Sequence, residues 1–251
     1  MSKKQIIVRK DQSDLAQATA DWIIASAAKT IAQRGRFLLA LSGGSTPEQA
    51  YIRLADSKAQ RLIDWTKVYV FFGDDRFVPP YDSRSNLAMA ARTLLAHVPI
   101  PYGNVFPIIT QVPTAKDAAD LYCKSLAEFL GVAAKSPPPS LDLILLGLGD
   151  DGHTASLFPA APALLVKDAW FTWSPPGVLP PPVDRITATL PMLNAGREIL
   201  FLVAGAKKAE ILQQILEDPA APAKYPAALV GTDSSVTWLI DEAAAKLLKH
   251  S

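Results

Sequence analysis

The 251-residue chain has a single cysteine, three histidines and a formal net charge of only +1. With Cys123 alone, an internal disulfide and a cysteine-based metal cluster are excluded. A net charge near zero provides no overall field to attract nucleic acid or an anionic membrane. No apolar run reaches the ~18 residues of a membrane span, and the first residues lack the apolar segment of a secretion signal. We therefore expect a cytoplasmic protein that binds neither nucleic acid nor membranes, with protein partners left open.

Short apolar segments alternate with segments of helical spacing along the whole chain. Strands are predicted at 5–9, 36–41, 67–72, 141–146, 170–173, 185–190 (half-buried), 199–204 and 236–240, and helices at 14–33, 48–54, 86–95, 115–130, 206–216 and after Asp241. This alternation indicates right-handed crossovers, and hence an α/β fold with a mostly parallel sheet flanked by helices. Because no long polar linker divides the sequence, residues 1–251 are predicted to form a single domain. Residues 115–185 are a candidate for a small additional lobe beside the sheet.

The segment 141–159, LDLILLGLGDDGHTASLFP, begins as a buried strand and breaks into a loop rich in glycine and acid. Such loops, at the carboxyl ends of strands, are where open α/β sheets bind ligands. The loop matches G-x-G-x-x-G, but Pro159 and Pro162 leave at most about two helical turns behind it. Two aspartates would also face the pyrophosphate, so a dinucleotide cofactor is not expected.

His153 stands two residues after Asp151 in this loop. A histidine is the usual proton acceptor from water near neutral pH, and a nearby carboxylate can fix its tautomer. We therefore predict that His153 is catalytic and that Asp151 orients it; a histidine that is merely hydrogen-bonded within a turn is the alternative. Metal binding by Asp150, Asp151 and His153 has little support, because no second histidine is close in the sequence.

A second loop, Gly43, Gly44, Ser45 and Thr46, lies between a predicted strand and a predicted helix. Two glycines expose backbone N–H groups, the helix start adds positive potential, and the hydroxyls add donors, a combination that favours phosphate. Thr46 is the predicted helix cap and Pro47 fits the first turn. An ordinary strand-to-helix turn is the alternative.

Charged side chains follow other predicted strands. Asp74 and Asp75 are candidate acid/base groups, and Arg76 is a candidate anion ligand, although a solvated turn would have the same composition. Arg185 and Lys207 are further cations beside strand ends, where each taken alone would be a surface charge.

Six segments together resemble the glucosamine-6-phosphate isomerase/6-phosphogluconolactonase family. They are LSGGSTP at 41–47, FFGDDRFVPPYDSRSN at 71–86, LGLGDDGHTASLFP at 146–159, DRITATLP at 184–191, AGAKKAEIL at 204–212 and VTWLIDEAAA at 236–245. The resemblance implies a Rossmann-like parallel sheet without a dinucleotide. It also implies hydrolysis of 6-phospho-D-glucono-1,5-lactone to 6-phosphogluconate, a step of the oxidative pentose phosphate pathway.

The deaminase branch of this family typically carries a glutamate five residues after the histidine, where this chain has Phe158. The segments at 74–76 and 83–86 also look like those of the lactonase branch. Two departures are Asp75, where glutamate is common, and LPPPVDR before the strand at 185, where a lysine often precedes the prolines.

On this basis the lactone is a small-molecule substrate that needs neither a metal nor another cofactor. His153 would take a proton from water and Asp151 would hold the imidazole. The phosphate would lie on Gly44, Ser45 and Thr46, with Arg185 and Lys207 as its cations. Arg76 would bind the sugar or the developing oxyanion, and Asp74 would order Arg76 or contact substrate hydroxyls. Two alternatives stay open: an isomerase or deaminase of amino-sugar phosphates, and a sugar-phosphate sensor without activity.

Overall fold

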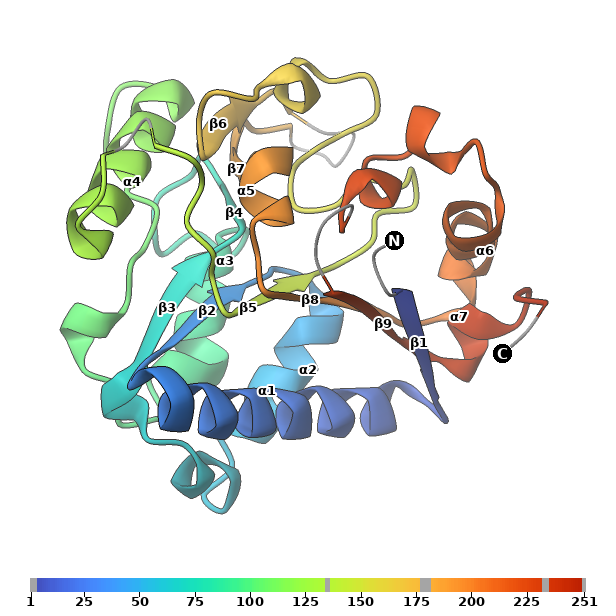
Figure 1. Cartoon of the computed structure of the whole chain (residues 1–251), viewed down its shortest axis with the longest axis horizontal. Coiled ribbons are helices and arrows are strands. Elements are labelled where there is room, and N and C mark those ends of the chain that lie inside the picture. Colours follow the sequence, from blue (N-terminus) through green and yellow to red (C-terminus); the bar gives the residue numbers. More distant parts are fainter. Residues whose placement is uncertain (1–3, 134–135, 177–181, 232–234, 250–251) are drawn as a thin grey trace.

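A six-stranded parallel sheet forms the centre of the computed structural model, which describes residues 4–133, 136–176, 182–231 and 235–249. Its strand order is β1-β9-β8-β5-β2-β3 (Figure 1). The strands are β1 (Lys4–Arg9), β2 (Phe37–Leu41), β3 (Val68–Phe72), β5 (Leu143–Leu146), β8 (Glu198–Val203) and β9 (Ser235–Asp241). All five neighbouring pairs run parallel, so the predicted Rossmann-like α/β fold is confirmed.

Helices cover both faces of this sheet. Figure 1 shows α1 and α2 along one face and α5 over the other. The α-helices are α1 (Gln12–Arg34), α2 (Ser45–Leu54), α3 (Asn86–Ala90), α4 (Ala115–Leu130), α5 (Leu190–Asn194), α6 (Ala209–Glu217) and α7 (Glu242–Ala245). A π-helical turn, Ala91–Leu95, continues α3. None of the described helices is both long and apolar enough to cross a membrane.

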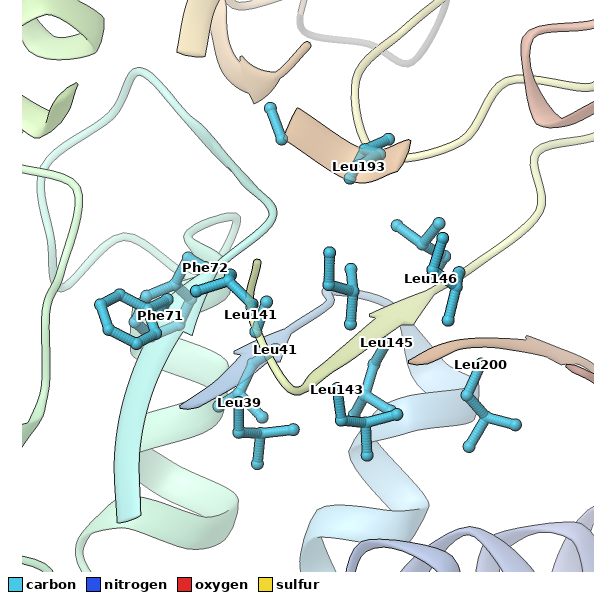
Figure 2. Packing of buried hydrophobic residues seen from close by; sticks show 14 of the residues in the cluster. Leu39, Leu41, Phe71, Phe72, Leu141, Leu143, Leu145, Leu146, Leu193 and Leu200 are labelled. Atoms are coloured by element: carbon cyan, nitrogen blue, oxygen red, sulfur yellow. The ribbon is translucent and has the colours of Figure 1, made fainter. Parts of the chain in front are cut away.

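The central strands are buried on both sides, as their continuous apolar sequences require. Every residue of β2 and β5 is buried. Figure 2 shows Leu193 of α5 above β5 on the side of Leu146, while Leu143 and Leu145 point to the opposite face. Truncating such a leucine to alanine costs about 2–5 kcal/mol, so a change like Leu145→Ala would threaten the platform that carries the loops.

A second, antiparallel sheet lies beside the first. Its strand order is β4-β7-β6, and the strands are β4 (Asp74–Arg76), β6 (Phe171–Ser174) and β7 (Arg185–Ala188). The backbone N–H of Phe171 donates to Cys123 Sγ at 3.3 Å, which ties β6 to α4. This is the additional lobe expected in residues 115–185, but its edge strand β4 and all of β7 except Arg185 lie outside that range.

Two local predictions were wrong. Thr46 is not the cap of α2, because the helix begins at Ser45 and Gly44 is its N-cap, with φ of 108°. The segment 185–190 is not a half-buried strand: all four residues of β7 are buried between two partner strands, and Thr189 caps α5 by accepting from the N–H of Met192. The proline-rich segment before β7 includes residues 177–181, which lie outside the described part of the chain.

Candidate active site

Loops from four strands of the main sheet enclose one cavity at their carboxyl ends. Its volume is about 410 Å³, within the range of small-molecule sites. The lining residues come from the segments after β2, β3 and β5, from the end of β8 and the segment after it, and from the start of β7: Ser42–Pro47, Asp74, Arg76, Asn86, Gly147–Asp151, His153, Ala155, Arg185, Leu202–Ala204 and Lys208. Nine of the ten predicted site residues line this cavity, and the tenth, Lys207, does not.

The loop after β2 is fixed from below by a buried tyrosine. Tyr51 Oη accepts from the N–H of Ser42 at 3.0 Å and donates to its carbonyl at 2.9 Å. Burial raises the pKa of Tyr51, so the phenol stays neutral. Because α2 starts without a side-chain cap, its first N–H groups remain available to a ligand. This geometry supports the predicted anion site at Ser45 and Thr46.

Residues of β4 alternate between the cavity and the protein interior, as side chains of a strand must. Asp74 and Arg76 line the cavity, whereas Asp75 faces away from it. The Asp75 carboxylate accepts from the N–H groups of Asn86 at 2.6 Å and Leu87 at 3.1 Å, at the start of α3. Burial raises the pKa of Asp75 to about 6 despite these bonds. Asp75 therefore holds α3 in place and is not an acid/base group of the cavity.

Asp74 is held in one orientation by two side chains. Its Oδ2 accepts from Ser156 Oγ at 2.6 Å, and its Oδ1 accepts from Asn86 Nδ2 at 3.2 Å. Within the described chain no ion pair joins Asp74 to Arg76, and Arg76 donates instead to the carbonyl of Arg84. The geometry thus favours contact with substrate hydroxyls over the ordering of Arg76 as the role of Asp74.

The histidine loop places an imidazole against a carboxylate. His153 Nδ1 lies 2.5 Å from Asp151 Oδ1, and the His153 N–H donates to the same oxygen at 3.1 Å. Burial alone would raise the pKa of Asp151, but the hydrogen bonds and the charge of His153 outweigh it, so this pKa is lowered. The charged carboxylate binds Nδ1–H, which leaves Nε2 as the basic nitrogen.

Glycine is required next to this pair. A Cβ on Gly149 would stand 2.0 Å from His153 Nδ1 and 2.7 Å from Asp151 Oδ1. The N–H of Gly149 also donates to the carbonyl of His153 at 2.8 Å, which closes the loop. The middle glycine of the G-x-G-x-x-G pattern is therefore explained here by the space that the imidazole occupies.

Two arginines face each other across the small sheet, where Arg76 is paired with Arg185. Arg185 is only 5% exposed, and its guanidinium lies 5.5 Å from the centre of the Phe158 ring. Burial, followed by the charge of Arg76, lowers the pKa of Arg185. In the described part of the chain the Nε atoms of both arginines lack a hydrogen-bond partner, and neither arginine forms an ion pair. Two such guanidiniums are candidate ligands for an anion.

Phe158 contacts both the histidine and one of the arginines. Its ring lies 4.6 Å from that of His153, centroid to centroid and tilted, and 5.5 Å from the Arg185 guanidinium. Its place in the sequence indicated only that the deaminase glutamate is absent, and these two contacts could not be foreseen.

The lysine at the cavity is Lys208, and the prediction of Lys207 is corrected by one position. Lys207 is exposed and lies outside the lining, whereas Lys208 lines the cavity and pairs with Asp150. A signal was present in the sequence. Leu212 and Ile215 form the buried stripe of α6, and extending this stripe by one turn towards the N-terminus reaches Lys208.

These residues could support proton transfer from water and binding of an anion, both within one cavity. Among the residues described, no group of three or more histidine, cysteine, aspartate or glutamate side chains is arranged to hold a metal ion.

The fold and the cavity define an α/β protein whose ligand site lies at the carboxyl ends of a parallel sheet. Residues 10–238 match the family described as glucosamine-6-phosphate isomerases/6-phosphogluconolactonase, and the chain belongs to this family. The resemblance seen in the sequence is thereby confirmed.

Similar proteins include two curated cyanobacterial 6-phosphogluconolactonases. The one from Synechocystis is 41% identical over 221 residues, 88% of each chain. The one from Nostoc is 39% identical and aligns over 96% of this chain and 97% of its own. The structure of 6-phosphogluconolactonase from Trypanosoma brucei has a TM-score of 0.84 at 30% identity, covering 99% of this chain and 100% of its own.

Proposed function

We propose that this chain is a 6-phosphogluconolactonase, which hydrolyses 6-phospho-D-glucono-1,5-lactone to 6-phosphogluconate in the oxidative pentose phosphate pathway. The names of the cyanobacterial and trypanosomal relatives support this reaction. The observation that carries it is the pairing of His153 with Asp151, at 2.5 Å, in a cavity that also contains two guanidiniums without an ion-pair partner in the described chain. A proton acceptor and an anion site are what hydrolysis of a phosphorylated lactone requires.

The reaction needs one base that later acts as an acid. Nε2 of His153 takes a proton from water while the water oxygen bonds to C1 of the lactone. The tetrahedral intermediate then breaks its bond between C1 and the ring oxygen, and the imidazolium returns the proton to that oxygen. Asp151 stabilises the imidazolium through Nδ1–H. General base catalysis of this kind contributes about 10²–10⁴-fold.

The remaining side chains bind the substrate. The phosphate would lie on the N–H groups and hydroxyls of Ser45 and Thr46, with Lys208 in place of Lys207 as a cation. Arg185 would complete the phosphate site, and Arg76 would bind the sugar or the developing oxyanion. Asp74 would accept from substrate hydroxyls. Residues 1–251 would form one domain. The location of the protein in the cytoplasm stays a prediction.

The decisive experiment compares His153→Ala with His97→Ala. Lactone hydrolysis is followed as acid released at constant pH and is corrected for the spontaneous reaction. We expect His153→Ala to lower kcat about 10²–10⁴-fold with little change in KM. His97 is an exposed histidine whose Nε2 lies 2.8 Å from the carbonyl of Arg92, outside this cavity, so His97→Ala should behave as wild type. A near-normal kcat in His153→Ala would remove His153 from the chemistry.

The two alternatives predict other results with the wild-type protein. Release of ammonia from glucosamine 6-phosphate would indicate a deaminase, against which the position of Phe158 argues. Binding of 6-phosphogluconate without any lactone hydrolysis would indicate a sensor.

A further inference from the structure

Two adjacent aspartates in the loop after β5 have different partners. Asp151 binds His153, whereas Asp150 forms an ion pair with Lys208, which follows the neighbouring strand β8. The side chain of Asp150 is 76% exposed and that of Lys208 is 24% exposed. The pair therefore joins two loops at the solvent side of the cavity, and both residues belong to its lining.

Lys208 differs in this respect from the other cations of the cavity. Arg76 and Arg185 form no ion pair within the described chain, although the charges of Asp74 and Asp75 act on Arg185 from a greater distance. At Lys208, by contrast, the carboxylate of Asp150 is already bound to the ammonium group. A phosphate that binds Lys208 must displace Asp150 or tolerate its negative charge nearby, and either event opposes binding.

We propose that Asp150 competes with the phosphate of the substrate and product for Lys208, and so determines how tightly phosphorylated ligands are held. This proposal rests on the proposed function, because it requires Lys208 to contact the phosphate. Asp150 is a specificity-determining residue in this scheme and takes no part in proton transfer. When a ligand leaves, Asp150 returns to Lys208 and favours release of the product.

The expected effect is modest, because a largely exposed ion pair is easily broken. Removing the charge of Asp150 should tighten binding of phosphorylated ligands about two- to fivefold at low salt. The gain should shrink at high ionic strength, where both the ion pair and the repulsion are screened. An uncharged ligand, such as unphosphorylated glucono-1,5-lactone, should be indifferent to the change.

The test uses Asp150→Asn, Lys208→Met and the double variant, with KM for the phosphorylated lactone and the inhibition constant of 6-phosphogluconate as readouts. Asp120→Asn is the matched control, since Asp120 also pairs with a lysine, Lys116, but on the distant surface of α4. We expect Asp150→Asn to lower both constants and to leave kcat unchanged. In the Lys208→Met background the same substitution should have a much smaller effect, and Asp120→Asn should change neither constant.

Three results would overturn the proposal: unchanged constants in Asp150→Asn, raised constants, or an equal decrease in KM for the unphosphorylated lactone. Raised constants would mean that Asp150 positions Lys208 for the substrate. The proposed function is tested separately by Lys208→Met, which should raise KM for the phosphorylated lactone. If it does not, the phosphate site has been misassigned; if it does and Asp150→Asn has no effect, only the competition is refuted.

Discussion

A single methyl group added at Gly149 should disable the proposed base without touching it chemically. The Cβ of alanine would stand 2.0 Å from His153 Nδ1 and 2.2 Å from its Cε1. Unlike Gly44 and Gly152, Gly149 does not have a positive φ, so alanine suits the backbone. The conflict is with the imidazole and, at 2.7 Å, with the Oδ1 of Asp151 that holds it. To reach an ordinary contact of about 3.4 Å the ring must move about 1.4 Å, and displacements near 1 Å can cost about 10²-fold in rate.

We therefore expect Gly149→Ala to lower kcat at least about 10²-fold in the lactone assay. KM should change much less, because the proposed phosphate ligands belong to other loops. The melting temperature should stay within a few degrees of wild type, as the ring can move into the cavity. Gly73→Ala is the matched control: its Cβ would meet only the carbonyl of Leu41, at 3.6 Å, so it should keep normal activity.

A double-mutant cycle shows whether the effect passes through His153. In a His153→Ala background the added methyl has no ring to displace, so Gly149→Ala should reduce the residual rate less than about threefold. If Gly149→Ala retains more than a third of the wild-type kcat, catalysis does not depend on this placement of the imidazole. If it reduces the rate equally in both backgrounds, it acts on something other than His153.

Three further predictions concern the groups around this pair. A Cβ on Gly43 would stand 1.9 Å from Asn86 Oδ1, so Gly43→Ala should push the Asn86 side chain away from Asp74. We expect KM to rise in the lactone assay. An unchanged KM would show that the contact between Asn86 and Asp74 is dispensable. Arg185→Met should raise KM about 10- to 100-fold. The melting temperature should stay equal or increase, because the buried guanidinium lacks an ion-pair partner in the described chain. A marked loss of stability would contradict this explanation. Burial raises the pKa of Asp75 to about 6, so the folded state holds a proton that the unfolded state has lost; stability from this group is present below about pH 4 and lost as pH rises to about 6. As the pH rises from 4 to 6, the free energy of unfolding measured with urea should therefore fall for wild type relative to Asp75→Asn. A difference between the two that does not change with pH would show that the pKa of Asp75 is not raised.

The main sheet could be predicted because the sequence pattern that indicates each of its strands lies within the strand itself. Continuous apolar segments such as 37–41 and 143–146 become strands buried on both faces, and their alternation with helices implies parallel pairing. The same rule placed the loops after β2, β5 and β8 at one edge of the sheet. Six predicted site residues from the loops after β2 and β5 therefore meet in one cavity, and Asp74, Arg76 and Arg185 join them from the small sheet.

The small sheet could not be predicted in this way, because its pairing is long-range. Nothing near Arg76 in the sequence indicates that Arg185 will be its partner. Likewise, the adjacent acids Asp74 and Asp75 look equivalent until the alternation of β4 turns one to the cavity and the other to the start of α3. Lys207 and Lys208 are also neighbours of the same type, and only the helical phase of α6 separates them.

The position of the cavity follows from how the two sheets meet. β2 and β5 are paired at only two positions, Leu39 with Leu143 and Ala40 with Ile144, so their carboxyl ends are free to diverge. The small sheet reaches this opening through Asp74, Arg76 and Arg185. Ser156 joins the parts, since its N–H donates to Thr187 Oγ1 at 3.1 Å and its Oγ donates to Asp74 at 2.6 Å.

This connection has a chemical consequence. The loop that holds His153 is tied through Ser156 to β4 and β7, the two strands that supply the arginines. A proton acceptor and the cations for an anionic substrate are thus fixed relative to each other by buried hydrogen bonds, and Phe158 contacts both His153 and Arg185. Such preorganisation is what a site must provide when the reaction needs only a correctly placed water molecule and no covalent intermediate.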